Sequence, residues 1–148
     1  MAAEAKDRPD VRVMTEIGII AQLSQARLER NLPDGLSAAQ FGVLIHFSRR
    51  GGRESPARLA SAFQVTKGAM TNTLQRLEAR GFVAIVGDPD DGRRKWVSLT
   101  AEGARAFELG LGAMRPHLEN MRSAFTEDEF KAALPFLQAL RVWLDENR

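Results

Sequence analysis

The amino-acid sequence predicts a mainly α-helical protein of six helices with one small β-hairpin. Residues that favour helix starts precede five of six amphipathic stretches, and a turn with proline and glycine at 88–92 separates two short apolar runs. The 148 residues suffice for one domain with a real core, and 44% hydrophobic with 27% charged residues is ordinary for a globular chain. We find no internal repeat and no apolar run long enough to span a membrane.

The first two helices are expected over 11–31 and 37–49. Apolar residues recur at helical spacing in the first, and a Pro-Asp-Gly sequence at 33–35 ends it. Ser37 and Gln40 have the spacing of a capping box at the start of the second. The first helix is apolar on more than one face, which is typical of a helix with two packing partners.

The centre of the chain carries two short helices and the hairpin. Ser55-Pro56 opens a helix over 55–63, Thr66 opens a second over 66–80, and Gly81 follows where a left-handed terminator is needed. Val83 and Ile85 on one strand, and Val97 and Leu99 on the other, alternate so that the hairpin has one apolar face. A helix, a turn, a helix and a β-ribbon in this order can place a helix in the major groove of DNA and a loop on the adjacent backbone or minor groove.

Two longer helices are expected over 100–122 and 126–146, the first with a kink at Pro116. Thr126 and Glu129 form a second capping-box pattern, and Thr100 is a further N-cap candidate.

The terminal helices carry more apolar surface than a small DNA-binding core needs. We therefore expect one domain over 1–148, in which 11–35 and 100–147 form dimerisation helices and 36–99 forms a DNA-binding lobe. The alternative is a monomer with a single larger core.

Charge is distributed unevenly along the chain. Residues 49–95 contain ten Lys or Arg and five Asp or Glu, a net charge of +5, whereas the remainder carries −3. A basic centre between acidic flanks fits a polyanionic partner, although charge counts alone also fit an ordinary solvated surface.

The helix over 66–80 has one apolar and one polar face. Met70, Leu74 and Leu77 are expected to pack inward with Leu59 and Val65. Asn and Gln can each form two bonds to adenine, Thr offers a hydroxyl and a methyl, and Lys and Arg reach phosphate or guanine. The candidate DNA-binding residues are therefore Thr66, Lys67, Gly68, Thr71, Asn72, Gln75 and Arg76. The alternative is an ordinary solvent face.

The hairpin tip adds three consecutive cations, Arg93, Arg94 and Lys95. An extended loop that ends in arginine can enter a minor groove, where the potential is strongly negative. Asp91 is expected to orient the tip by a charge-assisted pair with Arg93. The alternative is a solvated turn.

These residues resemble a known family. The wing pattern Asp91-x-Arg93-x-x-x-Val97-x-Leu99-Thr100, followed by Glu102-Gly103, is similar to that of MarR-family winged helix-turn-helix regulators. Leu59-Ala60, Val65-Thr66 and Leu74-x-x-Leu77-Glu78-x-x-Gly81-Phe82-Val83 also resemble that family. The resemblance implies a homodimer through the first, fifth and sixth helices, with 66–80 as the recognition helix and Arg93 as the wing arginine.

The chain departs from several branches of this family. It has no cysteine, so it lacks the residue that a cysteine-based peroxide sensor oxidises. Its tryptophans are Trp96 and Trp143, so it lacks the tryptophan-bearing N-terminal extension of the urate-responsive branch. Two histidines, His46 and His117, are too few for a zinc-sensing site, and we expect no metal.

No pattern of catalytic residues stands out. The sequence has no Gly-x-Ser-x-Gly, no P-loop and no cysteine nucleophile, so we expect no enzyme and no cofactor. His46 lies between Ile45 and Phe47, a setting more typical of a core or pocket histidine than of a catalytic base.

The sequence thus favours a ligand-responsive transcriptional repressor that binds a palindromic operator as a homodimer. The resemblance implies a small aromatic or anionic effector between the dimer helices and the DNA-binding lobe. From their places on the first two helices, Ser24, Arg27, His46 and Arg49 are the candidate contacts. The alternative is a winged-helix module that binds proteins and not DNA, as an anti-repressor or scaffold. The polar N-terminus lacks the apolar centre of a signal peptide, so we expect a cytoplasmic protein.

Overall fold

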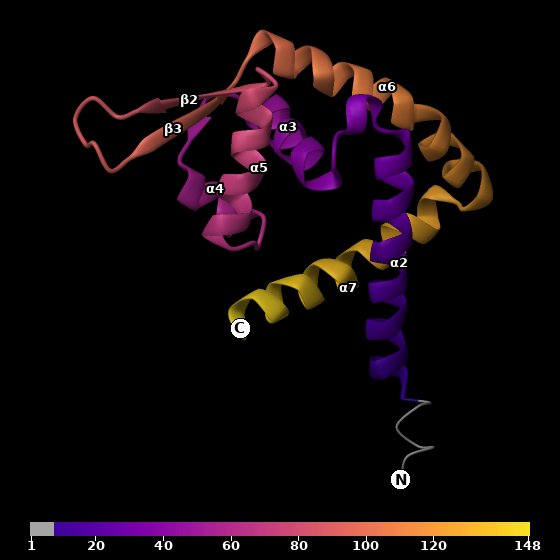
Figure 1. Ribbon diagram of the computed structural model, residues 1–148. Coiled ribbons are helices and arrows are strands. Elements are labelled where there is room, and N and C mark those ends of the chain that lie inside the picture. The colour runs from indigo at the N-terminus through magenta and orange to yellow at the C-terminus, as the bar shows by residue number, and fades with distance from the viewer. Residues whose placement is uncertain (1–7) are drawn as a thin grey trace. The chain divides into compact units, whose positions relative to one another are not determined.

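The computed structural model describes residues 8–148, which form two compact units, one ending at Ala113 and one from Met114 to Arg148. Residues 1–7, most of the polar segment on which the signal-peptide argument rests, lie outside this description. In chain order the elements are α2 (Pro9–Asn31), the 3-10 turn η1 (Pro33–Gly35), α3 (Ala38–Arg50), β1 (Arg53–Glu54), α4 (Pro56–Ala62), α5 (Lys67–Ala79), β2 (Val83–Gly87), β3 (Lys95–Leu99), α6 (Ala101–Ala124) and α7 (Glu127–Glu146) (Figure 1).

The helix starts follow from local capping, as the sequence predicts. Ser37 accepts from the backbone N–H of Gln40 while the Gln40 side chain accepts from the Ser37 N–H, a complete capping box. Thr66 and Thr126 cap α5 and α7 with their hydroxyl oxygens, which accept from the N–H groups of Ala69 and Glu129. At Thr126 this bond is one half of the expected capping box. Gly81, with φ of 74°, ends α5 in the left-handed conformation that glycine adopts without strain.

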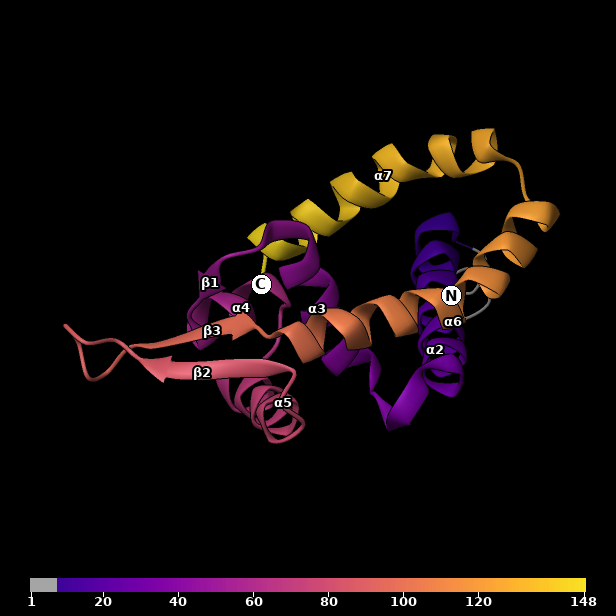
Figure 2. The ribbon, with the colours of Figure 1, turned by 90° about the horizontal axis from the view of Figure 1, so that it is seen from above.

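The hairpin is part of a larger sheet than expected. β2 and β3 pair antiparallel with Val83 opposite Leu99 and Ile85 opposite Val97, which confirms the shared apolar face. β1, which the sequence analysis did not predict, pairs with β3 as a third strand, giving the order β1-β3-β2. We call β2, β3 and the residues 88–94 between them the wing, and it projects beyond α4 and α5 (Figure 2).

The core of the first unit lies between α3, α4, α5 and the sheet. Its fully buried side chains are Phe41, Val43, Leu44, Phe47, Leu59, Leu74, Leu77 and Val97. Met70, Leu74 and Leu77 face inward as predicted, but the prediction for Val65 is wrong. Val65 precedes the Thr66 cap, so it is not part of the inward face of α5, and it remains 44% exposed.

Two glycines let α6 approach the rest of the first unit closely. A Cβ on Gly103 would lie 2.0 Å from the carbonyl oxygen of Phe82, and a Cβ on Gly110 would lie 2.3 Å from the ring of Phe41. Both glycines are buried, so the start of α6 is fitted against the lobe through its backbone.

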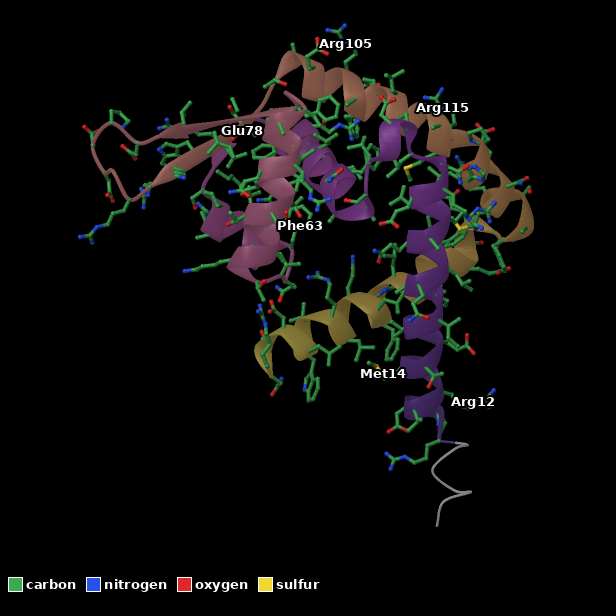
Figure 3. The ribbon with its side chains drawn as sticks, viewed as in Figure 1. Arg12, Met14, Phe63, Glu78, Arg105 and Arg115 are labelled. Carbon is green, nitrogen blue, oxygen red and sulfur yellow. The ribbon has the colours of Figure 1, made fainter. Side chains whose placement is uncertain are left out.

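The helices at the two ends of the chain leave large apolar side chains uncovered. No described residue of α2 or α7 is buried. Met14, labelled on α2 in Figure 3, is 44% exposed, and Leu23 is 66% exposed. Pro116 lies inside α6, which continues through it to Ala124. None of the helices described between residues 8 and 148 has the length and apolar character needed to cross a membrane.

Candidate nucleic-acid interface

α5 presents a continuous polar face opposite its buried one. Met70, Leu74 and Leu77 attach the helix to the core. The residues of the other face are all exposed: Thr66, Lys67, Gly68, Thr71, Asn72, Gln75 and Arg76. Gly68 carries no side chain and has open space at its Cβ position, which favours a close approach of the backbone there to another molecule. Free N–H groups at that end suit a phosphate.

Two of these side chains are joined on the helix surface. The Nε of Arg76 donates to the Oδ1 of Asn72 at 3.3 Å, one turn apart. The bond orients the Asn72 amide so that its NH₂ group remains available to a base edge.

The wing tip is ordered by a series of hydrogen bonds. The Asp88 N–H donates to the Arg94 carbonyl at 2.9 Å, and the Arg94 N–H donates to the Asp91 carbonyl at 3.0 Å. Asp91 contacts the backbone of Arg93 instead of forming the expected ion pair with its guanidinium, and its role in orienting the tip stays a prediction. Its Oδ1 accepts from the backbone N–H of Arg93 at 3.0 Å, because a carboxylate two residues upstream reaches that amide most directly.

Asp88 ties the tip to the sheet. Its Oδ1 accepts from the Asp90 N–H at 2.9 Å, and its Oδ2 accepts from the indole N–H of Trp96 at 3.0 Å. These two bonds hold the pKa of Asp88 below its ordinary value, so the carboxylate stays ionised at neutral pH. This role of Trp96 could not be predicted from the sequence, because the contact depends on the register of the hairpin.

The structure brings the helix and the wing cations around one hollow of about 410 Å³. Lys67 and Thr71 from α5 line one side, and the N-terminal end of α4 contributes Ser55 and Pro56. The wing supplies Asp91, Arg93, Arg94 and Lys95. A second hollow of about 330 Å³, lined by Thr71, Gln75 and Lys95 among others, continues between α5 and the strands. Four cations at one concave surface attract a phosphate backbone.

The four candidate effector contacts line neither of these hollows. Ser24 and Arg27 lie on α2, and Arg49 lies exposed in the last turn of α3. His46 is bound inside the lobe, with its Nε2 3.0 Å from Glu54 Oε1 and with side chains 12% and 18% exposed. The centroid of its ring also lies 5.5 Å from the ring centroid of Phe63, which is labelled beside α5 in Figure 3. Residues 8–148 bring no three His, Cys, Asp or Glu side chains together as a metal site.

Comparison with known proteins gives a consistent result. A model of the MarR family matches residues 34–94. The transcriptional regulator PecS of Dickeya dadantii is 32% identical over 154 aligned positions, which cover 96% of this chain and 90% of PecS. The transcriptional regulator HosA of Escherichia coli O111:H- is 38% identical over 90 residues, covering 61% of this chain and 65% of HosA.

Solved structures agree in fold. A MarR variant from E. coli in complex with operator DNA superimposes with a TM-score of 0.78 at 28% identity, covering 88% of this chain and 94% of that one. BpsR of Bordetella bronchiseptica, whose DNA binding is regulated by 6-hydroxynicotinic acid, gives a TM-score of 0.77 at 25% identity, covering 88% and 98%.

Proposed function

The chain belongs to the MarR family of DNA-binding transcriptional regulators, and on that premise we propose that α5 and the wing together form its DNA interface. The observation that carries the proposal is the hollow at which Lys67 of α5 meets Arg93, Arg94 and Lys95 of the wing. A duplex offers phosphates on both sides of a groove, and a surface with cations on two separate elements can hold both sides.

Each predicted residue takes a role from its place on this surface. Thr66, Lys67 and Gly68 lie at the start of α5 and approach phosphate, while Arg93, Arg94 and Lys95 reach the adjacent backbone or the minor groove. Asp91 sets the backbone at Arg93. The residues that read bases lie further along the exposed face of α5 and are Thr71, Asn72, Gln75 and Arg76.

The uncovered apolar helices support a homodimer, the assembly in which MarR-family regulators act. We propose that 11–35 and 100–147 form the dimerisation region and that 36–99 forms the DNA-binding lobe. Exposed apolar side chains on both terminal parts of the chain include Ile20, Leu23, Leu134, Phe136 and Trp143. A second copy is the partner that would remove such surfaces from water. Two-fold symmetry then predicts a palindromic operator.

Regulation by a small aromatic or anionic molecule, with repression as the output, completes the proposal. The precedent is BpsR, and Ser24, Arg27, His46 and Arg49 stay the candidate contacts. A ligand that favours a lobe spacing unsuited to the operator weakens DNA binding by its difference in affinity for the two states. Because the DNA that such a regulator binds is the chromosome, we place the protein in the cytoplasm.

The salt dependence of DNA binding tests this proposal. Affinity for a duplex should fall steeply with salt, with a log–log slope of about −0.9 for each phosphate neutralised. A chain that binds no duplex, or binds with a slope near zero, would contradict a DNA-binding role and would favour the alternative of a protein-binding module.

A further inference from the structure

Trp96 lies on the sheet face that points away from the core. Residues alternate between faces along a strand, so Trp96 and Ser98 share the face opposite to buried Val97. Arg53 of β1 is paired with Ser98 and therefore reaches the same face, diagonal to Trp96. The Arg53 guanidinium carbon lies 4.4 Å from the centroid of the Trp96 ring, and that of Arg94 lies 5.4 Å from it.

The same indole is tied to the wing tip at its edge. Its N–H donates to Asp88, which also accepts from the Asp90 N–H, so one carboxylate links β3 to the first half of the tip. Arg94, stacked on the ring, lies in the second half. We call Trp96, Asp88, Arg53 and Arg94 the Trp96 bracket.

The bracket is anchored in the lobe through β1. Arg53 and its neighbour Glu54 pair with β3, and the Glu54 side chain points to the other face of the sheet, where it bonds His46 of α3. The strand thus holds the indole on one face and the helical core on the other. A ring fixed in this way limits the positions open to residues 88–94.

From these contacts we propose that Trp96 is a positioning residue for DNA binding. It holds the wing tip in the conformation that presents Arg93 beside the N-terminal end of α5. An ordered tip loses less conformational entropy on binding, so more of the phosphate interaction appears as affinity. The inference rests on the DNA interface proposed above and assigns Trp96 and Asp88 a role that needs no DNA contact of their own.

Trp96→Phe tests the inference, because it keeps an aromatic ring and removes the N–H. The probe is a duplex selected from a random library by the unaltered protein. We expect affinity for this duplex to fall roughly three- to tenfold, which is the range for one net hydrogen bond with partial loss of stacking. We also expect the slope of log affinity against log salt to become shallower. Val65→Thr is the control, since Val65 is an exposed apolar residue outside α5 and the wing and should leave both values unchanged.

A second variant separates positioning from charge. Asp88→Ala removes a negative charge close to a polyanion, so charge alone would tighten binding, whereas loss of the bracket should weaken it about threefold. Thermal unfolding of every variant, measured without DNA, shows that the fold persists.

Coupling to Arg93 gives the decisive result. Because Trp96 is proposed to act by positioning Arg93, its replacement should matter little once the Arg93 side chain is gone. In an Arg93→Ala background, Trp96→Phe should therefore change affinity less than roughly twofold, which is the error expected for independent sites. Equal costs in both backgrounds, or an Asp88→Ala variant that binds more tightly, would overturn the bracket while leaving the DNA interface intact. A parent protein that selects no duplex would overturn both.

Discussion

Asn72 and Arg76 show how a single bond can serve recognition at the residue scale. The Arg76 Nε–H donates to the Asn72 carbonyl oxygen, and the amide N–H groups take no part in that bond. Side-chain freedom that is lost before binding is not lost again on the DNA. The pair is therefore expected to act as a unit.

We expect Asn72→Ala to relax base preference at one position and to cost about 1–3 kcal/mol of binding free energy, because one good base contact is worth that much. Competition between cognate and single-substituted duplexes measures it. Ser61→Ala, at an exposed site on α4, is the control. Unchanged discrimination in Asn72→Ala would show that this face of α5 does not read bases.

Gly110 is a second position where one atom decides the packing. We expect Gly110→Ala to destabilise the fold by about 1–3 kcal/mol through overpacking, because the added Cβ would meet the buried ring of Phe41. Gly112→Ala, on the same helix with nothing within 4 Å, should instead stabilise it by up to about 1 kcal/mol through helix propensity. Denaturant unfolding compares them, and shifts of the same sign would contradict the close approach of α6 to Phe41.

Among the elements, the wing is a short antiparallel ribbon whose tip is structured before any partner arrives. Backbone hydrogen bonds join Asp88 to Arg94 and Arg94 to Asp91. The side chains of Asp88 and Asp91 accept from the N–H groups of Asp90 and Arg93. The cations are therefore presented by a hydrogen-bonded support, and their contribution should appear as a defined number of phosphate contacts.

We expect Arg93→Ala to weaken binding to all sequences and to reduce the salt slope by about 1 if the side chain contacts phosphate. If it enters the minor groove, the loss should concentrate on A·T-rich flanks. Arg105→Ala removes the same charge from the exposed surface of α6 and serves as the control. Equal losses in the two variants would reduce the role of Arg93 to general electrostatics.

In the molecule as a whole, exposed apolar surface is the dominant feature. α2 and α7 bury none of their described residues in the single chain, although both carry many large apolar side chains. Helices with so little burial are not stable by propensity alone. Their stability should therefore depend on a second copy.

We expect the melting temperature to rise with protein concentration, because an obligate dimer has no stable folded monomer. Leu23→Glu, which places a charge on the exposed apolar face of α2, should unfold the protein or lower its melting temperature sharply. Val65→Glu, at an exposed apolar site outside the terminal helices, should not. Sedimentation of a well-folded 16.4 kDa species would contradict the dimer.

Features that depend on near neighbours could be predicted from the order of the amino acids alone. Caps at Ser37, Thr66 and Thr126 placed helix starts to within a residue or two, since a cap joins one side chain to a backbone N–H only three positions away. Alternation at 83–85 and 97–99 predicted the strand faces, and the wing pattern indicated the family.

Contacts between residues distant in sequence emerged only in the folded chain. β1 has two residues, too few for any periodicity, and it exists because β3 offers an edge. The bonds of His46 to Glu54 and of Trp96 to Asp88 depend on strand register, and the close approach at Gly110 depends on how α6 packs against α3. Such contacts form between segments whose proximity results from packing of the whole lobe, so no local pattern in the sequence encodes them.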